Sequence, residues 1–458
     1  MIVGQKKRLR FPEPEETVLK ELAEILPSRL YVVGGAVRES LVDYVRATDI
    51  DLACALTPEE LTTSLHGTDF IVKPTSPKLG TLKIIRDGVS FEYTTFRTDS
   101  YPDGGRHTPD EVRFTSSILE DALRRDFTVN ALYYDPIDEE ILDPTGRGLE
   151  DLEEGVLSTV RDPDDVLSED GLRLLRLVRF SASLGLKIDA DTFSSAQNNA
   201  RLILDVAPER IRTEMDKILV SDTVRGITGA QYYALTLMYE LGLLSIVLPE
   251  IVPCYDYPQN PKYHKYPLDE HIFKAVRYAP TGLRLVALLH DLGKPVAKVK
   301  YGEHARHGQE SEKIAREWMA RYCYPKKVIE RTAKIIRYHM FDLRCEASEK
   351  TLRIFIQKNH DIIDDLIDFK VADARAKGDA VVPHSAIRLR RLYEKMKSEG
   401  VPLLVSDLEI DGNDLVEKNV PVEERGRILS AILERAAYDE EFRHREAQLR
   451  YVTDRYSF

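Results

Sequence analysis

Short apolar runs separated by turn residues make up the segment from Leu30 to about Tyr134. Within each run, β-branched and aromatic residues alternate with polar ones, which is the pattern of a strand with one buried face. Short helical stretches lie between the runs, so the segment is predicted to be an α/β or α+β unit. The runs predict strands at 30–33, 50–53, 81–85 and 89–96.

Two local signals predict where elements of this segment begin and turn. Asp87-Gly88 stands between the last two runs and predicts a hairpin, because a turn that needs positive φ is easiest at glycine. Thr57, followed by Pro58 and Glu60, predicts the start of a helix. The threonine supplies a capping hydroxyl, the proline suits the first helical position, and the glutamate completes a capping box.

After Asp143-Pro144-Thr145-Gly146 the periodicity becomes helical. Between Glu169 and Leu184, for example, apolar residues recur every three or four positions, so this stretch is predicted to be one helix. The carboxy-terminal two thirds is therefore predicted to be a helical array without internal repeats. Breaks rich in proline and glycine divide the chain into a head at 1–145, a neck at 146–225, a body at 226–385 and a tail at 386–458.

The composition is that of a soluble globular protein, with 43% hydrophobic and 31% charged residues among 458. No apolar run approaches the roughly 20 residues of a membrane helix, and the basic amino terminus lacks the apolar core of a secretory signal. The four cysteines have neither disulfide-framework nor metal-ligand spacing. We therefore expect a cytoplasmic protein. The net charge of −12 restricts any nucleic-acid site to a local basic patch.

Gly34-Gly35 ends the first predicted strand and opens a helix that carries Arg38. Paired glycines let backbone N–H groups approach an anion, and a helix start adds positive partial charge. Asp49 and Asp51 lie one short helix later, and on a strand both carboxylates would share one face. Such a pair suits Mg²⁺ beside a phosphate cradle. Considered singly, the glycines could form a simple turn and the aspartates an exposed strand end.

Four motifs in chain order resemble the bacterial-type (class II) tRNA nucleotidyltransferase and poly(A) polymerase family, of the DNA polymerase β superfamily. They are Gly34-Gly35-Ala36-Val37-Arg38, Asp49-Ile50-Asp51, Arg124-Arg125-Asp126-Phe127-Thr128-Val129-Asn130-Ala131-Leu132 and Glu169-Asp170-Gly171-Leu172-Arg173. The resemblance implies a polymerase-β-like nucleotidyltransferase head in an α+β fold, followed by an all-helical neck. It implies catalytic metal ligands at Asp49 and Asp51, and Glu92, on a later strand, is the candidate third carboxylate. It implies nucleotide-binding residues at Gly34, Gly35, Arg38, Arg125, Asp126, Asn130, Asp170, Arg173, Arg176 and Arg179.

The fourth motif has a chemical interpretation of its own. If residues 169–180 are helical, Asp170 and Arg173 share a face and present an acceptor beside a donor. Cytosine and adenine each place an amino donor beside a ring-nitrogen acceptor, whereas uracil and guanine place a carbonyl beside a ring N–H. The pair would therefore accept C and A, and Arg176 and Arg179 could hold the triphosphate. The alternative is a solvated arginine-rich helix face with internal ion pairs.

A polar, glycine-containing stretch at 99–110 is predicted to be a loop. The resemblance associates such a loop with the switch from C to A addition, which favours a complete CCA product. Glu39 stands where the family usually has aspartate, which keeps the charge but lengthens the side chain.

A second constellation lies in the helical body. Adjacent His and Asp after an apolar helix are poor core residues unless they are satisfied. Imidazole and carboxylate ligands suit transition metals as well as Mg²⁺, and six candidates could hold two ions bridged by Asp291. Their order resembles HD-superfamily phosphohydrolases, although a purely structural HD domain is an equal alternative. The predicted ligands are His271, His290, Asp291, His307, His339 and Asp373, and His107, His264, His304 and His360 are assigned to the surface or to loops.

Together the motifs predict an enzyme that adds CMP, CMP and AMP to the tRNA 3′ end from CTP and ATP and releases pyrophosphate. Its expected partners are tRNA and the two nucleotides, with no DNA or membrane. Basic runs in the tail, at 387–397 and 425–455, could follow tRNA phosphates or be solvated helix faces. The alternatives are an A-adding enzyme or poly(A) polymerase of the same family, and an HD-site phosphohydrolase acting on nucleotides or 2′,3′-cyclic phosphates.

Overall fold

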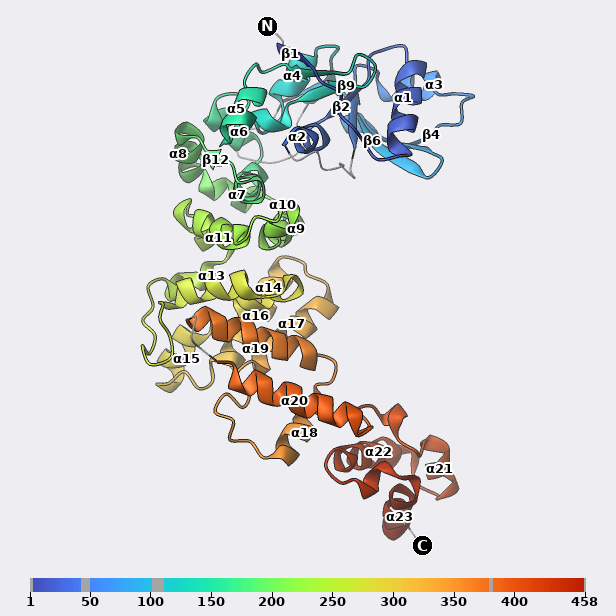
Figure 1. Ribbon diagram of the computed structural model, residues 1–458, viewed down its shortest axis with the longest axis vertical. Coiled ribbons are helices and arrows are strands. Elements are labelled where there is room, and N and C mark those ends of the chain that lie inside the picture. Colours follow the sequence, from blue (N-terminus) through green and yellow to red (C-terminus); the bar gives the residue numbers. More distant parts are fainter. Residues whose placement is uncertain (1–2, 43–49, 101–110, 379–381, 457–458) are drawn as a thin grey trace. The chain divides into compact units, whose positions relative to one another are not determined.

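The computed structural model describes residues 3–42, 50–100, 111–378 and 382–456. The chain divides into two compact units, Met1–Pro249 and Glu250–Phe458. The strands gather in the blue and cyan part of the chain, and nearly everything after it is helical (Figure 1). Within the described ranges, no helix is long and apolar enough to cross a membrane. The four domains expected from the sequence stay predictions.

One twisted sheet forms the head of the first unit. All neighbouring strands in it run antiparallel except β3 and β6, which are parallel. The described strands follow the order β1 (Val3–Lys6), β10 (Glu140–Asp143), β9 (Tyr133–Asp135), β2 (Tyr31–Val33), β3 (Asp51–Cys54), β6 (Val89–Thr95), β5 (Thr81–Arg86) and β4 (Ile71–Ser76). The predicted strands are thus confirmed, with ends that shift by a residue.

Both local signals are also confirmed. Strands β5 and β6 form a hairpin whose turn has Asp87 at φ 49° and Gly88 at φ 80°. Helix α3 (Pro58–Ser64) begins with a complete capping box. The Thr57 side chain accepts from the backbone N–H of Glu60, and the Glu60 carboxylate accepts from the backbone N–H of Thr57. These elements form where predicted because their signals are local.

The two faces of the sheet have different surroundings. On one face, Val32, Leu52 and Tyr134 belong to a core shared with helices α1 (Glu15–Ile25) and α2 (Gly35–Val42). On the other face, the strand register places Tyr133, Val33, Asp51 and Glu92 in one row across β9, β2, β3 and β6. Side chains paired directly across neighbouring strands lie on the same face. This row carries Asp51 and Glu92, two of the three predicted metal carboxylates.

The remaining elements of the first unit are mostly helices. They are α4 (Ile118–Leu123), α5 (Gly148–Glu154), α6 (Pro163–Glu169), α7 (Leu172–Leu184), α8 (Ala190–Asn198), α9 (Pro208–Leu219), α10 (Asp222–Arg225), α11 (Ala230–Glu240) and α12 (Leu243–Val247). Two small strand pairs accompany them, β7 (Arg97–Ser100) with β8 (Glu111–Phe114) and β11 (Val156–Leu157) with β12 (Lys187–Ile188). The predicted helical array is confirmed apart from the two-residue strands β11 and β12.

The single helix predicted from Glu169 to Leu184 is wrong at its start. Helix α6 ends at Glu169, Asp170 is extended, and α7 begins at Leu172. A Cβ on Gly171 would lie 2.3 Å from the backbone oxygen of Leu202, so only glycine fits this close approach. The Asp170 carboxylate accepts the N–H of Leu172 at 3.1 Å, which stabilises the break. A distant contact therefore overrides the local periodicity.

The second unit is helical throughout its described residues. Its helices are α13 (Leu268–Tyr278), α14 (Arg284–Leu289), α15 (Lys294–Tyr301), α16 (His307–Arg321), α17 (Lys326–Tyr338), α18 (Glu349–Lys358), α19 (Ile363–Lys377), α20 (His384–Ser398), α21 (Gly412–Glu417), α22 (Val422–Ala436) and α23 (Arg445–Tyr456). Helices α13, α14 and α19 pack together, as do α16 and α17. The last three helices enclose a separate small core around Leu415, Ile432 and Val452.

Candidate functional sites

The Gly34-Gly35 turn connects β2 to the first turn of α2. Gly34 has φ +70°, and its N–H donates to the backbone oxygen of Leu132 at 3.1 Å. A Cβ on Gly34 would lie 3.6 Å from Nη1 of Arg125, and one on Gly35 would lie 3.7 Å from Nη2 of Arg38. Two guanidinium groups therefore flank a turn that has no side chains of its own. This arrangement suits a phosphate group.

Arg38 is a buried cation whose charge and hydrogen-bond donors are only partly matched by its partners. Its guanidinium donates to the amide oxygen of Asn130 and pairs with Glu39 at 3.3 Å, while its buried Nε has no hydrogen-bond partner. Burial, together with the nearby guanidiniums of Arg179 and Arg176, lowers the pKa of Arg38 to about 10, although Glu39 opposes the shift. An anion beside Arg38 would offset both the burial of its charge and the repulsion from the neighbouring guanidinium groups.

Asp126 connects the third motif to the fourth. Its carboxylate accepts from Nδ2 of Asn130 at 2.9 Å and from Nε of Arg176 at 2.7 Å. Burial opposes ionisation, but the charge of Arg176 and the hydrogen bond from Asn130 outweigh it and lower the pKa of Asp126 to about 2. Asp126 is thus a permanent anion that holds Asn130 and Arg176 in place, and Asn130 in turn holds Arg38.

Phe180 is a member of this site that the motifs did not predict. Three guanidinium carbons lie within about 5 Å of its ring centroid, those of Arg38 at 5.0 Å, Arg176 at 5.1 Å and Arg179 at 4.1 Å. Cations are attracted to the face of an aromatic ring, so Phe180 gathers the arginines from α2 and α7. The signal available in the sequence was the position of Phe180, directly after Arg179 and four residues after Arg176.

The fourth motif has different partners from those predicted. The Asp170 carboxylate accepts from both Nη atoms of Arg210, at 3.2 and 2.8 Å. Arg173 donates to Glu169 at 2.6 Å and to the backbone oxygen of Arg124 at 2.8 Å. Asp170 and Arg173 therefore do not share a helix face, because Asp170 lies outside α7. Their reading of a base stays a prediction.

The candidate metal carboxylates of the head are described in part. Asp51 begins β3, is exposed, and pairs in register with Val33 on one side and Glu92 on the other. Ile50 and Leu52 are buried on the opposite face, as the predicted alternation requires. Asp49 and residues 101–110 of the loop predicted at 99–110 lie outside the described residues, and residues 99–100 belong to strand β7. The oxygen ligands of Asp51 and Glu92, beside the glycine turn, fit a hard divalent cation.

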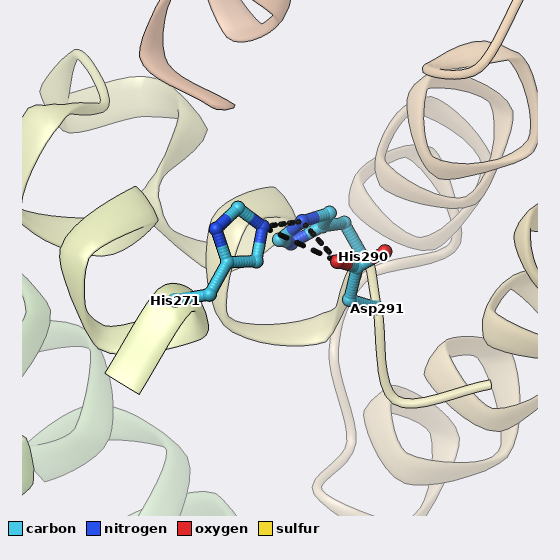
Figure 2. A group of neighbouring side chains, drawn as sticks. All are labelled: His271, His290 and Asp291. Carbon is cyan, nitrogen blue, oxygen red and sulfur yellow. Dashed lines mark hydrogen bonds and ion pairs between the residues drawn. The ribbon is translucent and has the colours of Figure 1, made fainter. Parts of the chain in front are cut away.

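The six predicted ligands of the helical body come together in the second unit. His271 comes from α13, and His290 and Asp291 follow α14. Figure 2 shows both imidazoles directed at the Asp291 carboxylate, with Oδ2 at 3.3 Å from Nε2 of His271 and 3.1 Å from Nε2 of His290. From α19, Oδ1 of Asp373 approaches Nε2 of His271 to 3.2 Å. His271, His290 and Asp291 form a group that could hold one metal ion, and Asp373 lies beside it.

A second group uses the other oxygen of Asp291. Its Oδ1 lies 3.0 Å from Nε2 of His307, which begins α16, and 3.6 Å from Nε2 of His339, which follows α17. The two imidazole nitrogens are 3.1 Å apart. Asp291 thus stands between two sets of ligands, as a bridging carboxylate would.

Backbone contacts orient three of the imidazoles. The Nδ1–H groups of His290, His307 and His339 donate to the carbonyl oxygens of Ala287, His304 and Ile336, at 2.8, 2.6 and 2.6 Å. Each contact occupies Nδ1 and turns Nε2 toward the cluster, where that nitrogen could bind a metal ion. This pattern distinguishes the cluster from incidental burial of histidines.

Two lysines complete the charge balance of the cluster. Lys294 lies 2.6 Å from Oδ2 of Asp291, and Lys377 lies 2.6 Å from Oδ2 of Asp373. Burial raises the pKa of both carboxyls, but neighbouring cations and hydrogen bonds outweigh it and lower both pKa values well below the usual range. Both carboxylates are therefore ionised and available as ligands.

Of the histidines assigned to loops, His304 is exposed, whereas the ring of His264 packs against the ring of His271, with 5.1 Å between the ring centroids.

Comparisons with known proteins cover most of the chain. Three family models match it: "Poly A polymerase head domain" at residues 30–158, "Probable RNA and SrmB- binding site of polymerase A" at 185–254, and "HD domain" at 271–378. The first match contains the glycine turn and the carboxylate row. The third contains all six candidate ligands of the body.

Relatives of known function fall into two groups by coverage. A CC-adding tRNA nucleotidyltransferase of Thermus thermophilus is 31% identical over 438 residues, which is 90% of each chain. A CCA-adding enzyme of Limosilactobacillus reuteri is 37% identical over 229 residues, 50% of this chain and 54% of the relative. The chain thus spans about half the length of the CCA-adding enzymes that it matches.

Solved structures agree on the fold. A Bacillus stearothermophilus CCA-adding enzyme in complex with CTP has a TM-score of 0.65 at 22% identity, covering 97% of this chain and 98% of the other. A Thermotoga maritima CCA-adding enzyme complexed with tRNA has a TM-score of 0.57 at 19% identity, covering 97% and 96%. The fold class is therefore α+β, with an amino-terminal head that contains the sheet and a helical body, as predicted.

The full-length relative settles the family. The chain belongs to the tRNA nucleotidyltransferase and poly(A) polymerase family, which confirms the resemblance drawn from the four motifs.

Proposed function

We propose that the protein is a template-independent tRNA nucleotidyltransferase that adds C, C and A to the tRNA 3′ end and releases pyrophosphate. The observation that carries the proposal is the phosphate cradle at the Gly34-Gly35 turn. Arg38 and Arg125 flank it, Phe180 gathers two further arginines, and Asp51 stands across the strand register from Val33, the residue before the turn.

The residues divide the chemistry between them. Arg38, Arg125, Arg176 and Arg179 bind and orient the triphosphate, since guanidinium groups match phosphate oxygens. Asp51, with Asp49 and Glu92, would hold Mg²⁺, which would activate the terminal ribose hydroxyl and stabilise the departing pyrophosphate. These roles follow from the cradle and from the carboxylate row on the same face of the sheet.

Base choice is assigned to Asp170 and Arg173. An ionised carboxylate only accepts hydrogen bonds and a guanidinium only donates them, so together they match C and A and oppose U and G. The relatives include CCA-adding and CC-adding enzymes, and poly(A) polymerases share the head. We place the activity in the cytoplasm, in keeping with four cysteines that lack the spacing of a disulfide framework.

The test uses tRNA transcripts that end before CCA, after the first C and after both Cs. Each is incubated with purified protein, Mg²⁺ and CTP, ATP, UTP or GTP singly, and the products are sized to one nucleotide. The proposal expects C on the two shorter transcripts, A only on the longest, and no U or G. Incorporation that stops after both Cs with all nucleotides present would reduce the function to CC addition.

A second candidate function belongs to the body. The complete six-residue set, with Asp291 between two groups of imidazoles, supports a two-metal phosphohydrolase acting on nucleotides or 2′,3′-cyclic phosphates. The test adds Mn²⁺, Ni²⁺ or Mg²⁺ and measures phosphate release or opening of a 2′,3′-cyclic nucleotide. Loss of this activity in Asp291→Ala, with retention in Asp51→Ala, is expected. Equal activity in the two variants would exclude the body as its source.

A further inference from the structure

Arg125 is held on two sides before any nucleotide arrives. Its Nε donates to the hydroxyl oxygen of Tyr133 at 3.0 Å, and its Nη2 donates to Oδ2 of Asp121 at 3.1 Å. The guanidinium carbon also lies 5.1 Å from the centroid of the Tyr133 ring. The remaining edge, Nη1, is the one that approaches Gly34. Two partners therefore leave one edge of the guanidinium directed at the glycine turn.

The two partners are themselves linked and buried. The Tyr133 hydroxyl donates to Oδ2 of Asp121 at 2.6 Å, and both residues have 0% exposure. Burial raises the pKa of Tyr133, so the phenol stays protonated and can donate to Asp121 while it accepts from Arg125. Arg124 and Arg125 outweigh the effect of burial and lower the pKa of Asp121. The three side chains thus form a closed hydrogen-bonded triangle with fixed donor directions.

The triangle stands on the face of the sheet that carries the metal carboxylates. Tyr133 pairs in register with Val33, and Val33 pairs with Asp51. Helix α4 contributes Asp121. The next residue in α4, Ala122, packs in one core cluster with Val33 and Tyr133. Arg125 therefore occupies a rigid position between the glycine turn and the sheet.

We propose that Tyr133 and Asp121 are positioning residues that orient the Arg125 guanidinium so that its Nη1 edge meets the phosphates of the incoming nucleotide at the Gly34-Gly35 turn. This inference rests on the proposed nucleotidyl transfer. A long arginine side chain loses rotamer freedom when it binds an anion, and the triangle removes that freedom in advance. The benefit appears in nucleotide binding, because base reading and tRNA binding do not use this contact.

The neighbouring residue on β9 offers a matched control. Tyr134 points to the opposite face of the sheet, where its hydroxyl accepts from the N–H of Leu9 at 3.3 Å. Tyr133→Phe and Tyr134→Phe each remove one phenolic oxygen from the same strand and keep the ring. Only the first variant releases Nε of Arg125.

Steady-state kinetics on a tRNA ending in CC separate the two variants. For Tyr133→Phe we expect KM for ATP to rise about tenfold, as the loss of one charge-assisted hydrogen bond implies, with kcat and KM for tRNA within about twofold. Asp121→Asn should also raise KM for ATP. In the double variant, the rise in KM should be smaller than the product of the two single rises, because both changes release the same guanidinium group. Tyr134→Phe should leave KM for ATP unchanged.

A binding measurement distinguishes positioning from general damage. Calorimetric titration should show that Tyr133→Phe weakens CTP binding and leaves cytidine binding unchanged, because cytidine has no phosphates. Equal weakening for both ligands, or wild-type KM and CTP affinity in both Tyr133→Phe and Asp121→Asn, would overturn the inference. Wild-type protein that adds no nucleotide would instead overturn the proposed function, while the titration would still report on Arg125.

Discussion

Asp291→Asn tests whether the body is built around bound metal. Asp291 is buried, at 1% exposure, and its two oxygens face four imidazoles and the ammonium of Lys294. Asparagine keeps the size of the side chain but replaces one acceptor with an N–H donor. That donor faces imidazole nitrogens or a lysine, whichever way the amide turns. The substitution removes the central negative charge from a buried cluster.

The magnitude follows from burial. Removing one partner of a buried charge pair costs roughly 3–5 kcal/mol. For a unit of this size each kcal/mol lowers the melting temperature by roughly 2–4 °C, which gives a decrease of about 6–20 °C. A bound ion adds to the difference, because an ion present at about 100 times its Kd stabilises the native state by roughly 2.7 kcal/mol.

Differential scanning calorimetry of the full chain, with Mn²⁺ and with EDTA, measures both effects. We expect EDTA to lower one transition of the wild-type protein, and Asp291→Asn to have that transition lower still and insensitive to metal. Asp364→Asn is the matched control, because Asp364 lies on α19 but is exposed, where it pairs with Arg390 at 2.9 Å. The reasoning would be refuted if Asp291→Asn melted like wild type, or if its transition still shifted with Mn²⁺.

Three further predictions concern the first unit. Asp51→Ala should lower nucleotide incorporation at least a thousandfold in a gel assay, because a metal ligand is lost, while leaving the metal-dependent calorimetric transition unchanged. Asp170→Ala should reduce the preference for CTP over UTP about tenfold or more in competition assays, since the acceptor that opposes U is gone; an unchanged ratio would remove Asp170 from base choice. Asp126→Asn should destabilise the protein by about 2 kcal/mol near neutral pH, because the folded pKa of about 2 lies below the ordinary 3.8. That contribution is fully present above pH 3.8 and disappears as pH falls through 2. The free energies of unfolding of the two proteins, measured in urea, should therefore become equal in acid. A difference that stays constant down to pH 2 would contradict the prediction.

Local patterns predicted the elements that depend on local chemistry. The hairpin at Asp87-Gly88, the capped helix at Thr57 and the glycine turn all form as expected, because each depends on conformational preferences within a few residues. The six candidate ligands of the body were also chosen from the sequence, because imidazoles and carboxylates suit metal ions and their order resembles that of HD-superfamily phosphohydrolases. Their convergence on Asp291 is what the structure adds.

Long-range contacts account for what the sequence did not predict. The break before α7 depends on the approach of Leu202 to Gly171, which lie far apart in the chain. In the sequence, Phe180 and Tyr133 occupy positions typical of apolar core residues. Only the fold shows that guanidinium groups lie against their rings. Arg210 belongs to no motif, and its pairing with Asp170 joins α9 to the break before α7. Each of these positions has a role that only its tertiary neighbours define.

The most direct test of the account is the length of the product made on a tRNA transcript that lacks CCA. Purified protein, Mg²⁺, CTP and ATP should extend it by three residues and then stop, and sequencing should read C, C and A. Extension by two residues, an open-ended A tail or no extension would each contradict the central claim.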